Sequence, residues 1–305
     1  MGTTIKATAV SADPALNSSI RHASTAATRC LERAGISTDQ VDLLINAGVY
    51  RDRNMAEPAM AALIQKEVGI NLDYIEHPTP TPGFSFDLMN GACGMLNAVQ
   101  VADAYLRSGN AEYALVVSGD AHPGNGSARD KDTHQFPYAA SGAAMLLQRG
   151  LDTEAGFGRV RVRVSAGARR GVEGYLPVST MGTEGRRRIT VQQDDDYVDQ
   201  LVALAAEAVR EYVQVENVDL TGTLLVTSRP TPDFAIQLAQ RLGVPEESAL
   251  TATGVEGDPH SSALTFAYEE AVASGQVRAH EQLLFVAAGA GMTTACALYR
   301  PEPQS

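Results

Sequence analysis

The stretch that decides the fold runs from Phe86 to Gly109 and reads FDLMNGACGMLNAVQVADAYLRSG. A short extended piece gives way to the turn NGACG and then to a helical pattern, so Cys93 stands at a helix start. Unpaired N–H groups and the helix dipole at such a place stabilise a thiolate and lower the pKa of the thiol. The flanking glycines allow a tight turn and close approach of a substrate. The stretch therefore predicts either a nucleophilic thiol or a small buried cysteine that fills a crowded helix start.

The composition argues against several classes of partner. The chain has 305 residues, of which 44% are hydrophobic and 20% charged, which is enough for a large core. A net charge of -12 argues against nucleic acid, because phosphate binding requires a basic surface. No run approaches the roughly 18–20 apolar residues of a membrane span. The N-terminus also lacks the basic and apolar segments of a secretion signal. We expect a soluble, cytoplasmic protein without a membrane partner.

The three cysteines, Cys30, Cys93 and Cys296, are too few and too scattered for a disulfide framework. This usage indicates a reducing compartment. No CxxC pair or cysteine–histidine cluster is present, so we expect no metal site. Cys30 and Cys296 lie within apolar patterns and are expected to be core residues.

The order of strand and helix patterns recurs along the chain. VDLLINAGV at 41–49 is echoed by VDLTGTLLVTS at 218–228, and MAALIQKEVGI at 60–70 by FAIQLAQRLGV at 234–244. Alternating strands and helices predict parallel sheets with crossover helices. A repeat this long indicates a duplicated unit of the βαβαβ type. We therefore expect two halves, 1–150 with the cysteine and 151–305 with its partner residues. Within the join, RVRVRV at 159–164 alternates strictly and predicts a strand with one wet face.

The repeat also predicts which helix starts meet. When Gly109 is aligned with Gly275, Cys93 falls opposite Pro259 in the segment GDPHSSAL. Equivalent helix starts of two duplicated halves commonly face each other. We therefore expect Asp258 and His260 to lie across a shared cavity from Cys93.

Three stretches carry a resemblance to a known family. They are FDLMNGACGMLNAVQVADAYLRSG, GDPHSSALTFAYEEAVASGQV and LLFVAAGAGMTTACALYR. With their order and spacing, the chain resembles the thiolase superfamily, and most closely the ketoacyl-acyl-carrier-protein synthase III branch. The resemblance implies an α/β fold of five layers, αβαβα, usually in a homodimer and without a cofactor. It implies that Cys93 carries an acyl group. It further implies that the backbone N–H groups of Cys93 and Ala290 receive the oxyanion.

The chain departs from this family at both partners of the cysteine. Ser228 stands where the family has a histidine, and Asp258 stands where it has an asparagine. Ser228 could donate a hydrogen bond to a thioester carbonyl but cannot act as a base. Asp258 could serve as an orienter or base, and His260 as a replacement base. The alternative for His260 is a residue that packs at a helix start. His122 and His134 are expected in solvated loops.

Five arginines stand out in an acidic chain and suggest how a donor is held. They could dock an acidic carrier protein or the phosphate of pantetheine, or they could form a solvated loop beside Asp194–Asp196. The chain has no tryptophan, whereas family members that load from coenzyme A usually place one near the adenine. An acyl-carrier-protein thioester is therefore the favoured donor. The five residues are Arg169, Arg170, Arg186, Arg187 and Arg188.

The sequence leaves two functions open. The first is an acyl-thioester-dependent acyltransferase or atypical condensing enzyme, with the acyl group on Cys93, in a specialised polyketide or fatty-acid-like pathway. The second is a catalytically degenerate subunit that keeps the fold and supports a catalytic homologue in a heterodimer. The retained cysteine favours the enzyme, and the missing histidine favours the subunit.

Overall fold

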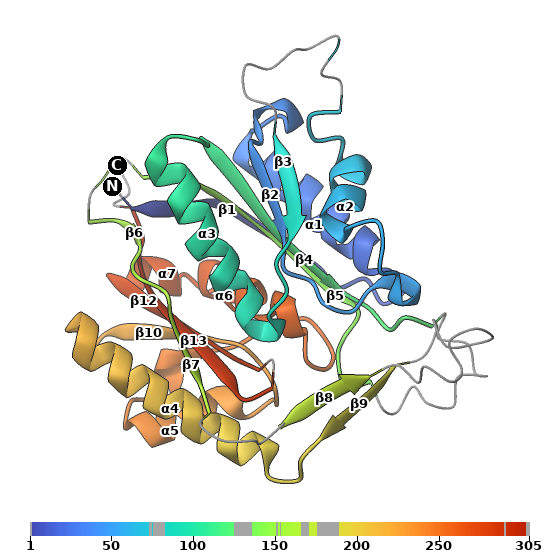
Figure 1. Ribbon diagram of the computed structural model, residues 1–305. Helices are drawn as coiled ribbons and strands as arrows, with labels where there is room; N and C mark the ends of the chain where they lie inside the picture. The colour runs from blue at the N-terminus through green and yellow to red at the C-terminus, as the bar shows by residue number, and fades with distance from the viewer. Residues whose placement is uncertain are drawn as a thin grey trace.

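The computed structural model describes residues 2–72, 75, 83–124, 136–150, 152, 154–165, 171–175, 189–289 and 291–302. Two β-sheets lie one above the other, and helices cover their outer faces and fill the space between them (Figure 1). Among the described residues, no helix has the length and apolar character that crossing a bilayer requires.

The first sheet has the strand order β1-β5-β4-β2-β3. Strand β2 is parallel to β3 and to β4, whereas β5 is antiparallel to both β4 and β1. The strands are β1 (Thr3–Ser11), β2 (Leu43–Asn46), β3 (Phe84–Asp87), β4 (Tyr113–Asp120) and β5 (Ser141–Arg149).

The second sheet repeats this arrangement with the order β11-β10-β12-β13-β6. Strand β10 is parallel to β11 and β12, and β13 is antiparallel to β12 and to both β6 and β7. The predicted duplication of one βαβαβ-type unit is therefore confirmed, while the boundary at residue 150 stays a prediction. The strands are β6 (Gly156–Phe157), β7 (Arg161–Val164), β10 (Thr223–Thr227), β11 (Ala249–Leu250), β12 (Gln282–Gly289) and β13 (Thr293–Arg300).

Helices complete the five layers. Helices α1 and α2 pack on the outer face of the first sheet, and α4 and α5 pack on the outer face of the second. Helices α3 and α6 lie between the sheets (Figure 1). The expected αβαβα fold is confirmed. The helices are α1 (Ser19–Ala34), α2 (Met60–Val68), α3 (Gly94–Ser108), α4 (Tyr197–Glu216), α5 (Phe234–Leu242), α6 (Ala263–Ala273) and α7 (Gln276–Ala279).

The middle layer explains why the α6 sequence is apolar on nearly all sides. A helix that lies between two sheets has no solvent-exposed face over most of its length. Accordingly Leu264, Phe266 and Tyr268 of α6 are all buried. One core cluster joins this layer to both sheets, since it contains Ile45 of the first sheet and Phe285 of the second.

Short elements position the site. Both middle-layer helices begin with a single 3₁₀ turn, η3 before α3 and η8 before α6, and the two turns contact each other. A separate ribbon of β8 and β9 completes the described strands. These elements are η3 (Gly91–Cys93), η8 (His260–Ser262), β8 (Val172–Tyr175) and β9 (Thr190–Gln193), with η1 (Thr38–Gln40), η2 (Asp52–Asn54) and η7 (Glu246–Ser248) elsewhere.

Residues Arg161–Val164 of the RVRVRV segment form strand β7, and burial alternates along it as predicted, but the valines and not the arginines lie on the exposed face. Arg161 of β7 is held by Glu216 of α4 with 2.6 Å between nitrogen and oxygen. Arg163 is held by Glu207 at 3.0 Å and by Glu211. Ion pairing with α4 therefore draws the arginines to the half-buried face. Val162 and Val164, in contrast, are 45% and 65% exposed.

Two paired glycines bring α1 onto the first sheet. Gly119 of β4 lies opposite Gly142 of β5. A Cβ atom on Gly119 would lie 2.1 Å from the carbonyl oxygen of Ser19, which is far inside contact distance. With α1 this close, the Ser19 N–H donates to Asp52 Oδ1 at 2.7 Å. The glycine pair thus fixes the loop that follows β2.

We expect Gly119→Ala to lower the free energy of unfolding by about 2–3 kcal/mol, because backbone cannot yield to the new methyl group. Gly35→Ala is the matched control. Gly35 ends α1 with a φ of +66° and has open space around it, so its substitution costs only about 1 kcal/mol of backbone strain. Guanidinium titrations of both variants measure the difference. Equal effects of the two substitutions would show that the close approach of α1 is unimportant.

Candidate functional site

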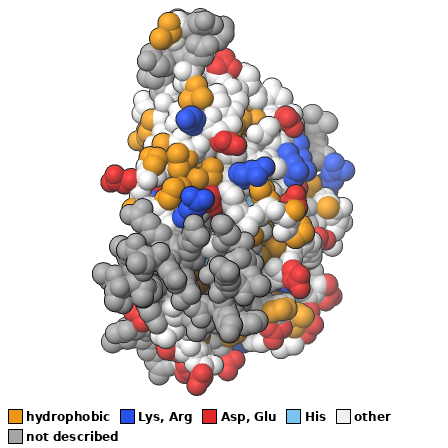
Figure 2. All heavy atoms as spheres, turned by 90° about the vertical axis from the view of Figure 1, so that its right-hand side faces the viewer, with side chains coloured by type: hydrophobic (Ala, Val, Ile, Leu, Met, Phe, Trp, Pro, Cys, Tyr) orange, Lys and Arg blue, Asp and Glu red, His pale blue; other side chains and the backbone are white. Residues whose placement is uncertain are grey.

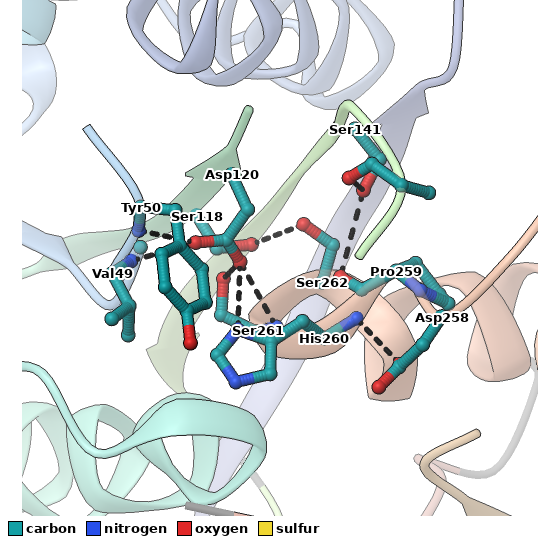
Figure 3. A network of polar contacts seen from close by, with 12 residues as sticks. Val49, Tyr50, Ser118, Asp120, Ser141, Asp258, Pro259, His260, Ser261 and Ser262 are labelled. Atoms are coloured by element: carbon teal, nitrogen blue, oxygen red, sulfur yellow. Dashed lines mark hydrogen bonds and ion pairs between the residues drawn. The ribbon is translucent and has the colours of Figure 1, made fainter. Parts of the chain in front are cut away.

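A buried carboxylate at the end of β4 forms the centre of the site (Figure 3). Asp120 Oδ1 accepts hydrogen bonds from the backbone N–H groups of Val49 at 2.9 Å and Tyr50 at 2.7 Å. Asp120 Oδ2 accepts from the Ser261 N–H at 3.2 Å and from the Ser261 hydroxyl. The same oxygen lies 3.2 Å from His260 Nδ1. The carboxylate therefore links the first sheet to the turn that precedes α6.

The charges of this pair follow from the contacts. Burial raises the pKa of Asp120, but the imidazole charge of His260 and the hydrogen bonds outweigh it, so the pKa lies below its ordinary value. Burial lowers the pKa of His260, but Asp120 and then Asp258 outweigh it, so this pKa lies above its ordinary value. The contacts thus favour a carboxylate beside an imidazolium.

His260 adopts a backbone conformation that is unusual for its residue type. Its φ is +47°, in the left-handed region that costs a non-glycine residue roughly 1–2 kcal/mol. Its ring packs 4.1 Å from the Tyr138 ring and 5.2 Å from the Tyr50 ring, measured between centroids. Nε2 has no hydrogen-bond partner in the part of the chain that the structure describes (Figure 3). Strained backbone of this kind clusters at functional sites.

Asp258 holds the backbone of His260 rather than its ring. Its Oδ1 accepts the His260 N–H at 2.8 Å, and its carbonyl oxygen accepts the Ala139 N–H at 2.8 Å. Burial raises the pKa of Asp258 to about 6, against the opposing effect of His260. The carboxylate in contact with the imidazole ring is thus Asp120, which the sequence analysis did not single out.

Cys93 is fully buried at the end of η3. Its Sγ lies 3.7 Å from the carbonyl oxygens of Ala287 and Thr293, which belong to the second sheet. Burial raises the pKa of the thiol to about 12. The expectation that the helix start lowers this pKa is therefore wrong, because desolvation of a thiolate between two sheets outweighs the helix dipole.

Ser228 follows β10 and contacts the neighbouring strand β12. Its hydroxyl donates to the Ala288 carbonyl oxygen at 3.1 Å and accepts from the Ala288 N–H at 2.8 Å. Its own N–H donates to the Val286 carbonyl at 3.0 Å. The hydroxyl proton is therefore already used by the backbone of the sheet.

The remaining candidates are one histidine, the two other cysteines and a set of residues outside the described ranges. His122 is half-buried rather than fully solvated, since its Nδ1 accepts the Gly124 N–H at 3.0 Å. Cys30 and Cys296 are buried as expected, and burial raises the pKa of both thiols. The other candidates lie outside the described residues: Ala290, His134, Arg169, Arg170, Arg186, Arg187 and Arg188.

Sequence reasoning missed several aromatic residues around His260. Tyr50 and Tyr138 stack with 4.8 Å between ring centroids, and Phe136 meets both rings edge to face. Tyr197 at the start of α4 donates to the Gly291 carbonyl at 3.4 Å. Asp120 carried a usable signal, because polar residues at the carboxyl ends of parallel strands commonly line sites. Within the described ranges, no group of three or more His, Cys, Asp or Glu side chains could hold a metal ion.

Comparison with known families agrees with this architecture. A family model described as 3-oxoacyl-[acyl-carrier-protein] synthase III matches residues 86–166, and the model of its C-terminal part matches residues 217–301. Together they cover more than half of the chain. The chain is 28% identical over 278 residues to β-ketoacyl-[acyl-carrier-protein] synthase III of Acidiphilium cryptum. That match covers 90% of this chain and 82% of the relative. The same enzyme of Rhizobium meliloti is 28% identical over 280 residues, with 90% and 82% covered.

Solved structures show the same fold at lower sequence identity. The 3-oxoacyl-(acyl carrier protein) synthase III of Pseudomonas aeruginosa superposes with a TM-score of 0.82 at 15% identity, covering 99% of each chain. OleA of Xanthomonas campestris, solved with lauric acid and lauroyl-CoA, gives a TM-score of 0.73 at 16% identity. It covers 98% of this chain and 99% of its own.

We expect the resting protein to resist alkylation at Cys93. With a thiol pKa of about 12, iodoacetamide should label this residue on the order of 10³-fold more slowly than free cysteine at pH 7. The labelling rate should rise about tenfold per pH unit between pH 7 and 9, as the thiolate fraction grows. Peptide mapping measures the rate, and protein unfolded in guanidinium is the control in which all three cysteines react. Rapid labelling of Cys93 that is independent of pH would contradict the buried, neutral thiol.

Proposed function

Because the chain belongs to the thiolase superfamily and resembles ketoacyl-acyl-carrier-protein synthase III, we propose that it is an acyl-thioester-dependent transferase with its acyl group on Cys93. The observation that supports this most is the contact between η3 and η8. That contact sets the helix start with the cysteine against the turn with the Asp120–His260 pair.

The proposed first step is transfer of the acyl group to Cys93. The thiol sulfur attacks the carbonyl carbon of the donor thioester, the carbon–sulfur bond of the donor breaks, and the thiol proton passes to the leaving thiolate. The backbone N–H groups of Cys93 and Ala290 would receive the oxyanion, which requires the Cys93 N–H to leave the Asn90 carbonyl oxygen that it contacts at 3.0 Å. Since the resting thiol is neutral and buried, its deprotonation has to accompany the binding of the donor.

In the proposed second step, an acceptor attacks the acyl-cysteine. His260 in its neutral form takes the acceptor's proton, and Asp120 stabilises the imidazolium that results. A pKa above the ordinary value makes His260 a stronger base once it has lost its own proton.

The altered residues argue against ordinary decarboxylative condensation. Decarboxylation of a malonyl thioester places negative charge on the thioester oxygen, which requires neutral or positive hydrogen-bond donors. The Ser228 hydroxyl is engaged with β12, and Asp258, with a pKa of about 6, is mostly anionic at pH 7. Each missing donor costs roughly 3–4 kcal/mol of barrier. We therefore propose acyl transfer or an atypical condensation, in a cytoplasmic, polyketide or fatty-acid-like pathway.

One observation favours the second candidate, a subunit without turnover. The Cys93 thiol lies between two carbonyl oxygens of the second sheet, and neither of these two neighbours is a titratable group. In that subunit Cys93 would have no catalytic role and would only fill space in the core. A heterodimer with a catalytic homologue would then be the working unit.

A carrier protein is the favoured source of the acyl group. The relatives take their names from acyl-carrier-protein substrates, and carrier proteins of this kind are acidic. Although the whole chain is acidic, Figure 2 shows several Lys and Arg side chains on one face, with Asp and Glu side chains among them. Charge complementarity on such a face speeds encounter with an acidic partner. Arg169, Arg170 and Arg186–188 remain proposed docking residues.

A homodimer is proposed on the edge of the first sheet. Strand β3 is the outer strand of that sheet, and an edge strand offers unpaired backbone groups to a second chain. Apolar side chains are exposed on and near it: Phe84 (44%), Met89 (50%), Leu72 (50%) and Ile75 (79%). A second copy of the chain would cover them.

We expect one acyl group on Cys93 after incubation with an acyl-carrier-protein thioester. Intact mass and peptide mapping should show the adduct in the wild type and none in Cys93→Ser. A coenzyme A thioester should react more slowly.

His260→Ala should lower transfer to an acceptor by a factor on the order of 10²–10⁴. Carbon dioxide release from a malonyl thioester should be slow relative to transfer.

Three outcomes decide against parts of this proposal. A label on another cysteine, or none with donors of varied chain length, would remove the enzyme and leave the supporting subunit. Rapid carbon dioxide release by the wild type would remove the argument against decarboxylation. Faster acylation from coenzyme A would remove the preference for a carrier protein.

We expect a dimer in solution that Phe84→Lys weakens, because a charge at the centre of an apolar edge must be desolvated. Val162→Lys is the matched control, since Val162 is an equally exposed apolar residue on the other sheet. Light scattering coupled to gel filtration measures the mass. A monomeric wild type, or a dimer that only the Val162 variant disrupts, would refute this interface.

A further inference from the structure

We propose that Asp120 is the positioning residue of this site, which holds the His260 imidazole by Nδ1 and leaves Nε2 to exchange protons with the acceptor. The inference rests on the proposed acyl transfer and deepens it, because it names the residue that orients the base. It also transfers the orienting role from Asp258, which binds backbone, to a carboxylate of the other half.

The first support is the set of donors around Asp120. Two backbone N–H groups hold Oδ1, while the Ser261 N–H, the Ser261 hydroxyl and His260 Nδ1 surround Oδ2. A carboxylate that receives several such bonds stays ionised even when it is fully buried. The ionised carboxylate can only accept a hydrogen bond from the imidazole, so Nδ1 must carry a proton.

The second support is that the ring has little freedom to turn. The Tyr138 ring lies 4.1 Å from the imidazole at an interplanar angle of 39°, and the Tyr50 ring lies 5.2 Å away. A ring flip would break the contact with Asp120 and place a carbon atom against a buried carboxylate. The geometry therefore presents Nε2, and not Nδ1, to a reacting group.

The third support is that contacts other than those of His260 also hold η8 and the residue before it against the first half of the chain. The Ser262 and Ser118 hydroxyl oxygens lie 2.8 Å apart, and the Ser141 hydroxyl donates to the Pro259 carbonyl at 3.5 Å. These contacts fix the turn, so the strained φ of His260 is imposed by its surroundings. A glycine would adopt this φ without strain, so the histidine side chain is retained at a cost.

The titratable groups that face the imidazole set its charge. They are Asp120 from β4, Asp258 from the segment before η8, Tyr50 from the loop after β2, and Tyr138 from the segment before β5. Burial raises the pKa of Tyr50 to about 12 and raises that of Tyr138 further. Both phenols therefore remain neutral, and Asp120 and Asp258 are the anions that act on His260.

His260 and Cys93 both return to their starting protonation states at the end of the proposed transfer. Neutral His260 keeps its proton on Nδ1, hydrogen-bonded to Asp120, and takes the acceptor's proton at Nε2 as the acceptor bonds to the acyl carbon. The bond from that carbon to Cys93 Sγ then breaks, and the thiolate regains a proton from Nε2. The products are the acylated acceptor, the thiol and neutral His260.

The first test needs no activity. In nitrogen-15 NMR spectra of the full chain, neutral His260 should carry its proton on Nδ1, whereas a neutral histidine in water prefers Nε2. His22 is the internal control, because its Nδ1 lies 2.9 Å from Ser11 Oγ and it has no contact with Asp120 among its described bonds. A neutral His260 protonated on Nε2 would overturn the proposal.

The second test uses Asp120→Asn, which keeps the shape of the side chain and removes its charge. The His260 titration should move to lower pH, and the midpoint of the pH–rate profile should move with it. The transfer rate should fall about 10²-fold in the wild-type background and change little in His260→Ala, since a positioning residue acts only through the base. His22 should titrate as before.

The outcomes separate this proposal from the one it rests on. An unchanged His260 titration in Asp120→Asn, or an equal loss of rate in the His260→Ala background, would make Asp120 a structural link and overturn the inference. If Asp120→Asn does not fold, the wild-type NMR measurement decides alone. If no donor acylates the wild type, the proposed enzyme fails, whereas the tautomer of His260 still decides whether Asp120 orients the ring.

Discussion

The contact on which the site depends is the burial of one carboxylate between two halves of the chain. An ionised carboxylate removed from water is strongly destabilising unless every lone pair finds a donor. Asp120 meets that condition only when the loop after β2 and the turn before α6 both reach it. The requirement therefore fixes the end of β4 relative to the turn before α6, which lies 140 residues further along the sequence.

Much of the architecture could be predicted from the sequence because it depends on periodicity. The recurring strand and helix patterns predicted two similar sheets and the meeting of the η3 and η8 helix starts. The position of Cys93 at a helix start also followed from its flanking glycines. The flanking glycines are a local feature and the strand and helix patterns are a repeated one, so both can be read from a single sequence.

The electrostatics of the site could not be predicted in the same way. The pKa of Cys93 depends on how completely two sheets cover it, and local sequence does not encode that burial. The position of Asp120 at the end of β4 carried a signal for a site, but its partner His260 belongs to the other half of the chain. Likewise, the alternation of β7 predicted one exposed face but not which one, because the glutamates that pair with its arginines lie on α4. In each case the deciding neighbour is distant in the sequence.

The shared middle layer has a consequence for how the chain folds during synthesis. The core cluster between the sheets combines β2, β4 and α3 with β10, β12 and β13, so the inner face of each sheet is covered by elements of both repeats. Loss of either repeat would therefore expose the inner apolar face of the other. Strand β13, which ends at Arg300, supplies part of that interior. The ribosome must translate β13 before the nascent chain can close around α3, so the inner apolar face of the first sheet needs protection from aggregation until that strand emerges.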